Sequence, residues 1–280
     1  MIQRASVSPR RPQASRLAAL ALGVPLAMSL AGCLGSTPDV TGSIRAPAGI
    51  AGPEADRAAT DRWAARYKAD PKDRTAALNY ARALRGTTQY NQAAAVLESL
   101  AIASPYDQEV LAAYGKSLAD AGRLKEAAAV LGRAHTPENP NWSVLSAQGS
   151  VADQLGDHGQ AQGYYSAALK IKPDEPHVLS NLGLSYALDN QLSRAEATMR
   201  QASQSPDADA RVRQNFALVL ALDGKFEEAQ RVAERDLSPA DAAASVAAIR
   251  GMIAQSDTWS SIQGKNGKAA KAKLATTAPL

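Results

Sequence analysis

A spacing of 34 residues between small and apolar side chains organises most of this 280-residue chain. When one unit is taken to begin at Pro176, the others begin at Arg74, Gln108, Trp142 and Ala210, with no insertion between them. Position 8 of every unit is then small, position 20 is always alanine, and position 24 is mostly large and apolar. Position 8 holds Ala81, Gly115, Gly149, Gly183 and Ala217. Position 20 holds Ala93, Ala127, Ala161, Ala195 and Ala229. Position 24 holds Leu97, Leu131, Tyr165, Met199 and Ala233. Such a period is typical of proteins in which each unit buries its apolar face against the next.

Within each unit, the pattern predicts two antiparallel helices that approach each other closely. Gly183 has no side chain and Ala195 a small one, so both allow the helices to touch, while Met199 fills the space beside them. Position 15 holds residues that tolerate a positive φ at a helix end. They are Gly122, Gly156, Asn190 and Gly224, and only Thr88 departs from this rule.

The best-preserved unit resembles the tetratricopeptide repeat, in which Leu, Leu-Gly and Tyr on the first helix precede Ala and a large residue on the second. Here these residues are Leu179, Leu182, Gly183, Tyr186, Ala195 and Met199. The predicted fold is therefore an all-α tetratricopeptide solenoid of five units over residues 54–256. A half-unit from Glu54 to Ala69 precedes the units. A capping helix follows, with Ser238 as N-cap, Pro239 at the first helical position and an end near Gln255.

The first 32 residues are predicted to be a secretory signal peptide. Four arginines precede or adjoin an apolar run from Leu17 to Leu30, which is shorter than the roughly 20 residues that span a bilayer. The run ends in Leu-Ala-Gly-Cys, which resembles the lipobox of bacterial lipoproteins. This resemblance implies lipidation of Cys33, and Leu34 after it implies an outer-membrane destination. The alternative is an ordinary signal peptide with an incidental cysteine.

The segments that flank the repeats have no helical or strand period. Residues 33–53 are rich in Gly, Pro, Ser and Thr, which predicts a lipidated cysteine followed by a flexible tether. Residues 257–280 predict a disordered tail whose lysines are either solvated or weakly attracted to an anionic surface.

Charge and motifs argue against nucleic-acid binding and catalysis. The formal net charge is +4, but four arginines near the N-terminus and four lysines in the tail leave the units slightly acidic, so no nucleic-acid partner is expected. A single cysteine excludes an internal disulfide. No phosphate loop, metal motif or hydrolase motif is present, so we expect no enzyme activity, no cofactor and no metal site. His158, placed in an inter-helix loop, and His177, near a helix start, are expected to be exposed.

The resemblance to tetratricopeptide arrays also implies a peptide-binding groove on the concave face. In such arrays, positions 2, 5, 6, 9 and 12 of each first helix point inward, and an asparagine at position 6 resembles the peptide-contacting asparagine of carboxylate clamps. The paired lysines of those clamps are absent here. Either the asparagines pair with a peptide backbone, or they only bond neighbouring loops. The predicted groove residues are Asn79, Arg82, Lys116, Asn181, Arg211, Gln214 and Asn215.

The C-terminal third resembles TadD-type lipoproteins of tight-adherence (Flp pilus) secretion systems. The resemblance is carried by the run from Ala210 to Leu220, by Gly224 to Ala229, and by Arg235-Asp236-Leu237 with the Ala-rich helix after it. It implies an outer-membrane lipoprotein facing the periplasm that assists assembly of the pilus machinery, with the secretin channel as its expected partner. The alternative is a repeat lipoprotein that serves another envelope complex, such as a different pilus or a cell-wall hydrolase.

Overall fold

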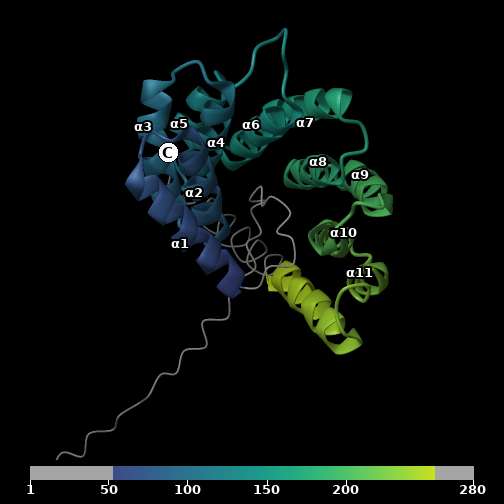
Figure 1. Cartoon of the computed structure of the whole chain (residues 1–280). Coiled ribbons are helices and arrows are strands. Elements are labelled where there is room, and N and C mark those ends of the chain that lie inside the picture. Colours follow the sequence, from purple (N-terminus) through teal and green to yellow (C-terminus); the bar gives the residue numbers. More distant parts are fainter. Residues whose placement is uncertain (1–52, 256–280) are drawn as a thin grey trace, which may run out of the picture. The chain divides into compact units, whose positions relative to one another are not determined.

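The computed structural model describes residues 53–255, and every element in that range is a helix (Figure 1). The predicted signal peptide, the lipidated Cys33, the tether and the tail lie outside the described residues. None of the described helices is long and apolar enough to cross a membrane.

Each unit contributes two helices, and the predicted unit boundaries are confirmed. The five first helices start at the first residue of each predicted unit: α2 (Arg74–Gly86), α4 (Gln108–Asp120), α6 (Trp142–Gln154), α8 (Pro176–Leu188) and α10 (Ala210–Leu222). The second helices are α3 (Tyr90–Ala103), α5 (Leu124–Leu131), α7 (His158–Ile171), α9 (Leu192–Gln204) and α11 (Phe226–Ala233).

The first helices begin where they do because a polar residue at position 34 caps four of the five. The side chains of Asp73, Asp107, Asn141 and Asp209 each accept a hydrogen bond from a backbone N–H of the first turn. This satisfies donors that have no partner within the helix. Glu175 makes no such bond, and α8 instead starts with Pro176, which has no N–H to satisfy.

The turn between the two helices has the same backbone conformation in all five units. Position 15 has a positive φ at Gly122, Gly156 and Gly224, at Asn190, and also at Thr88, where φ is 60°. The next residue then donates its N–H to the carbonyl five residues earlier, at 2.7–2.9 Å in every unit. This is the Schellman arrangement. Thr88 therefore departs from the pattern in residue type only, because the turn geometry is kept despite its branched side chain.

The predicted close contact between the helices of a unit is confirmed at position 8. A Cβ atom built on Gly149 would lie 2.6 Å from the Tyr165 ring, and one on Gly183 would lie 2.7 Å from Met199 Cγ. Gly115 meets Leu131 in the same way, at 2.6 Å. The five alanines at position 20 are fully buried. The small residues at positions 8 and 20 therefore set the distance between the paired helices.

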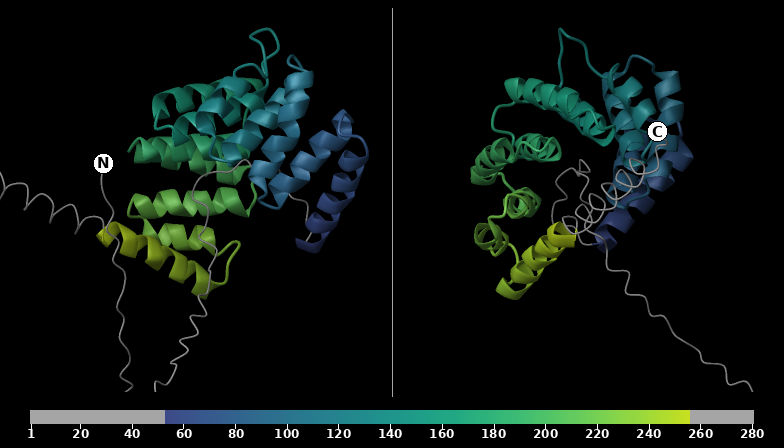
Figure 2. Two further views of the ribbon diagram at one scale, coloured as in Figure 1. Left: turned by 90° about the vertical axis from the view of Figure 1, so that its left-hand side faces the viewer. Right: turned by 180° about the vertical axis from the view of Figure 1, so that it is seen from behind.

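Neighbouring units pack mainly through the second helix of one unit and the first helix of the next. Successive first helices from α2 to α10 also contact each other, whereas within residues 53–255 no second helix contacts another second helix. Consequently the first helices line an inner face and the second helices lie on the outside (Figures 1 and 2).

A single helix covers each end of the described array. The helix α1 (Pro53–Ala69) packs against α2, with the rings of Tyr67 and Tyr80 at a centroid distance of 5.6 Å. At the other end, the helix 239–255 buries Ala242 and Val246 in the same apolar cluster as α11. Its first turn is capped by Ser238, which accepts a hydrogen bond from the Asp241 N–H at 3.2 Å. Both predicted end helices are therefore confirmed.

The contact at Gly149 predicts a graded response to alanine substitutions. Tyr165 is held by a 3.1 Å hydrogen bond from its hydroxyl to Asp153, so its ring has little freedom to move away from a new methyl group. We expect Gly149→Ala to lower the free energy of unfolding by about 1–3 kcal/mol. Gly183→Ala should cost less, because Met199 is flexible. Urea denaturation measures both, and a Gly149→Ala protein as stable as the wild type would contradict the proposed contact.

The matched control is Gly163→Ala, on the same helix as Tyr165. A Cβ on Gly163 would meet nothing within 4 Å. Since alanine is favoured over glycine inside a helix, this variant should gain up to about 1 kcal/mol.

The strained turn at Thr88 yields a second prediction. Replacing a branched residue at positive φ by glycine removes a steric cost, which the larger entropy of the unfolded glycine chain partly offsets. Thr88→Gly should therefore raise the free energy of unfolding by about 0.5–1 kcal/mol. Thr87→Gly is the control and should destabilise, because the Thr87 hydroxyl bonds the carbonyls of Ala83 and Leu84. Equal effects at the two positions would exclude strain at Thr88.

Candidate functional site: a basic cavity on the inner face

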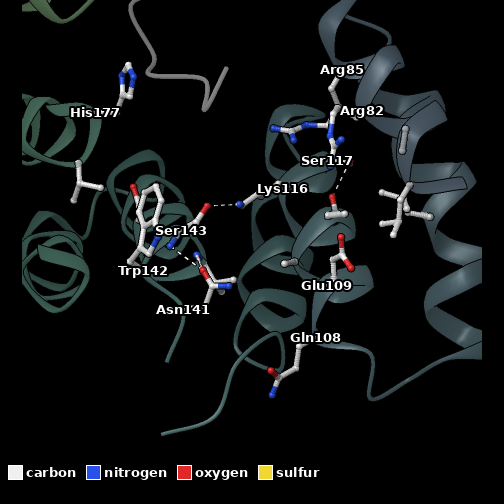
Figure 3. A pocket seen from close by; sticks show the side chains of 18 of the residues that line it. Arg82, Arg85, Gln108, Glu109, Lys116, Ser117, Asn141, Trp142, Ser143 and His177 are labelled. Carbon is white, nitrogen blue, oxygen red and sulfur yellow. Dashed lines mark hydrogen bonds between the residues drawn. The ribbon is translucent and has the colours of Figure 1, made fainter. Parts of the chain in front are cut away.

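A cavity of about 590 Å³ opens on the face formed by the first helices (Figure 3). Residues of α2, α4, α6, α8 and α10 all line it. Its walls therefore exist only when the units are stacked, since the lining residues come from all five of them.

Four of the seven predicted groove residues line this cavity. They are Arg82, Lys116, Asn181 and Arg211. Asn79, Gln214 and Asn215 lie outside its lining. Whether any of the seven contacts a bound segment stays a prediction.

The three predicted asparagines differ in what they bond. Asn79 donates to the Thr75 carbonyl at 2.8 Å and accepts from Arg82 at 3.2 Å. Asn215 donates to the Ser180 hydroxyl of the preceding unit at 3.0 Å. Asn181 has no side-chain hydrogen bond to any described residue. Of the three, Asn181 is therefore the one whose amide is available to a ligand in the cavity.

Lys116 is the central cation of the site. Its side chain is half-buried on α4 and reaches toward α6, where its Nζ donates to the Ser143 hydroxyl at 2.7 Å (Figure 3). Burial and, to a smaller extent, the positive charge of Arg85 lower the pKa of Lys116, and Asp120 opposes them, so that the pKa is about 8. Lys116 forms no ion pair within residues 53–255.

The lining as a whole has an excess of positive charge. It holds four basic side chains, Arg82, Arg85, Lys116 and Arg211, but only two carboxylates, Glu109 and Glu175. Both carboxylates are already neutralised by cations outside the lining.

Each of those two carboxylates forms an ion pair with a basic residue outside the lining. Glu109 pairs with Arg74 at 2.6 Å, and the buried Glu175 pairs with Lys172. Lys172 in turn lies over the Trp142 ring, 4.5 Å from its centroid. Arg85 is paired with Asp120 at 2.5 Å. Among the described residues, Arg82 and Lys116 are thus the lining cations without a carboxylate partner.

The two histidines that we expected to be exposed are both half-buried, so that expectation is wrong. His158 is the first residue of α7 rather than a loop residue, and its Nδ1 lies 2.9 Å from Asp153. His177 lines the cavity from α8, and its Nδ1 lies 3.0 Å from Arg211 Nη2. An acceptor role at Nδ1 fits the arginine, because a guanidinium can only donate.

Sequence reasoning missed several other lining residues. Glu109, Ser143 and His177 occupy position 2 and Arg85 occupies position 12, so the inward positions of the repeat would have identified them. Trp142 occupies position 1 and gives no such signal. Over residues 53–255, no group of three or more metal-ligating side chains comes together.

The half-buried cation predicts a pH-dependent stability difference. The pKa of Lys116 is lowered in the folded state from its ordinary 10.5 to about 8. The unfolded chain therefore binds more protons between these values, and stability gains from rising pH in that window. At pH 7 the charged amine is a cost, so Lys116→Met should raise the free energy of unfolding, by on the order of 1 kcal/mol.

This advantage of the variant should shrink as the pH rises from about 8 to about 10.5. Urea denaturation of both proteins at pH 7 and pH 9.5 measures the difference. Lys125→Met, on an exposed part of α5, serves as the control and should show little change at either pH. If the stability advantage of Lys116→Met grew with pH, it would not come from removing the charge of a half-buried amine.

Comparisons with known proteins agree with this architecture. A family model described as "Tetratricopeptide repeat" matches residues 143–175, which is the third unit. No curated protein sequence matches the chain.

Solved structures of similar fold cover most of the described range. PilW, described as a widely conserved type IV pilus biogenesis factor, has a TM-score of 0.60 at 20% identity, covering 69% of this chain and 91% of PilW. TTC0263, a thermophilic tetratricopeptide protein of Thermus thermophilus, has a TM-score of 0.54 at 21% identity, covering 62% of this chain and 96% of its own. The Cut9–Hcn1 structure has a TM-score of 0.58 at 13% identity, covering 70% of this chain but only 39% of the matched one. Together with the repeat register, these similarities identify the fold as a tetratricopeptide-repeat α-solenoid.

Proposed function

We propose that this protein is a non-catalytic scaffold that binds a segment of a partner protein in the basic cavity of its inner face. The observation that carries the proposal is the excess of unpaired positive charge in a cavity built from all five units. In this proposal Lys116, whose Nζ lies 2.7 Å from the Ser143 hydroxyl, acts as a binding cation for a carboxylate of the partner. The solenoid holds these residues in place without needing a ligand.

We further propose that the partner belongs to a tight-adherence pilus machine. The support is the sequence resemblance to TadD-type lipoproteins, together with the similarity in fold to PilW, a pilus biogenesis factor. In this proposal the protein acts as a pilotin-like assembly factor, and the outer-membrane secretin is its partner. The second candidate is an adaptor for another envelope complex, with the same cavity and a different partner.

The proposed location is the periplasmic face of the outer membrane, with lipidated Cys33 as the anchor. The support is the lipobox-like run that ends at Cys33. A tether of about 20 residues between the anchor and α1 would let the solenoid reach partners on the order of 25 Å away.

The anchor predicts the behaviour of a Cys33→Ser variant. Each buried CH₂ of an acyl chain contributes about 0.8 kcal/mol to membrane affinity, so several chains hold a protein stably and none releases it. We expect the variant to leave the outer-membrane fraction or to stay unprocessed, with unchanged helicity by circular dichroism. Fractionation of cells that express either protein measures this. A serine variant still in the outer membrane would exclude the lipid anchor.

The binding role is tested by crosslinking in living cells. A photo-crosslinking amino acid at position 181, inside the cavity, should capture a pilus component such as the secretin, identified by antibody. The same amino acid at position 125, on the outside of α5, is the control and should capture none. Capture of a cell-wall hydrolase at position 181 would favour the second candidate, and no position-specific product would refute a cavity-bound partner.

A further inference from the structure

The inner face changes from basic to apolar along the array. Position 9 of the first helices carries Arg82, Lys116, Ser150, Leu184 and Leu218 from the first unit to the fifth. Position 13 also ends in two leucines, although it has no basic residue in the first units. Its residues are Gly86, Asp120, Gln154, Leu188 and Leu222.

Positions 9 and 13 belong to one face of each first helix. Residues four apart lie on the same side of a helix, and Arg82 and Lys116 at position 9 line the cavity. Leu184 and Leu218 occupy position 9 of α8 and α10, the repeat position that Arg82 and Lys116 occupy in α2 and α4. The leucines therefore continue the face on which the cavity opens.

The apolar half lacks a cover among the described residues. Leu188 is 62% exposed and Leu222 is 40% exposed, whereas the leucines of the array core are nearly inaccessible. Their helices α8 and α10 are in contact, and Leu184 and Leu218 on the same face are half-buried. Four leucines on two adjacent helices thus form an apolar strip, which we call the leucine strip (Leu184, Leu188, Leu218 and Leu222).

The basic half is only partly compensated by carboxylates, because Asp120 at position 13 is already paired with Arg85. Arg82 and Lys116 have no carboxylate partner within residues 53–255, and the two lining carboxylates are paired elsewhere. A carboxylate from a partner would accept charge-assisted hydrogen bonds from both cations.

We infer that the inner face recognises a protein segment with two separate features: carboxylate side chains for the first two units, and large apolar side chains for the leucine strip. This inference rests on the proposed function and names the chemistry of the partner segment. Charge complementarity at one end and exposed leucines at the other commit the site to an acidic–apolar segment. Basic or uniformly polar segments do not fit.

The spacing of the two features follows from helix packing. Neighbouring packed helices lie about 8–10 Å apart, and α8 is two first helices beyond α4. The basic half and the leucine strip are therefore about 20 Å apart. An extended chain rises about 3.3 Å per residue, so about six residues separate the acidic and apolar features of the bound segment.

Fluorescence anisotropy with synthetic peptides tests the inference on the full chain in detergent. The probes carry two glutamates, a spacer of six serine and asparagine residues, and two leucines, in either order. We expect one order to bind. Lys116→Gln should weaken the binding of that peptide about tenfold or more, because one charge-assisted hydrogen bond is lost. The double variant Leu188→Ser/Leu222→Ser should weaken it by a similar factor, because apolar contacts are lost.

Matched controls make the same chemical changes outside the face. Lys125→Gln removes an exposed lysine from α5, and Ile102→Ser removes a side chain of α3 that is 76% exposed. Neither should change the affinity. Shortening the spacer to two residues should weaken binding in the wild type, and circular dichroism of every variant verifies folding.

Several outcomes would overturn the inference. One is equal affinity for a peptide without leucines, and another is an unchanged affinity in the Leu188→Ser/Leu222→Ser variant. Self-association of the full chain that this double variant abolishes would assign the leucine strip to a second copy. If no peptide binds while crosslinking at position 181 still captures a pilus component, the acidic–apolar chemistry is wrong and the proposed function stands. If crosslinking at position 181 fails as well, both the inference and the proposed function are wrong.

Discussion

The contact between position 8 and position 24 is the interaction on which this solenoid depends. At Gly115, Gly149 and Gly183 the second helix occupies the space that a Cβ would need, so the paired helices cross at one fixed point. Because interiors are close-packed, even one extra methyl group there has to displace a neighbour. Small residues at position 8 in all five units keep this close pairing possible along the array, although α5 and α11 are shorter than the other second helices. Each first helix then contacts the next one, which aligns the first helices side by side.

That alignment separates stability from recognition on each first helix. One side of the helix carries the small and apolar residues that pack within and between units. Positions 2 and 9 on another side hold no fully buried residue in any unit, so their residues can vary with less effect on the stack. At position 9 of this chain they vary from arginine and lysine in α2 and α4 to leucine in α8 and α10. The binding chemistry therefore changes along the array, while the packing chemistry stays constant.

The sequence could predict what depends on the period, and little of what depends on individual partners. The start of every first helix, the small residues at positions 8 and 20, and four of the cavity residues follow from the register. Trp142 could not be found this way, because its ring contacts Lys172, a residue that the repeat pattern does not relate to it. Nor could the bonds that occupy Asn79 and Asn215, since the register does not determine that one amide bonds the Thr75 carbonyl and the other the Ser180 hydroxyl. At Thr88 the period predicts the structure better than the residue type does. The turn keeps its positive φ there, although threonine is unsuited to it.

Lys116 connects the energetics of the fold with its proposed role. A half-buried amine that has a hydrogen bond to the Ser143 hydroxyl but no ion pair among the described residues is costly, and its lowered pKa expresses that cost. Packing alone would favour an apolar side chain at this place, as the leucines at the same position of the fourth and fifth units illustrate. A partner carboxylate would supply the missing counter-charge and raise the pKa of Lys116 again. The free energy lost to burying the amine in the empty cavity would then be recovered on binding, which is the trade between stability and function expected of a recognition site.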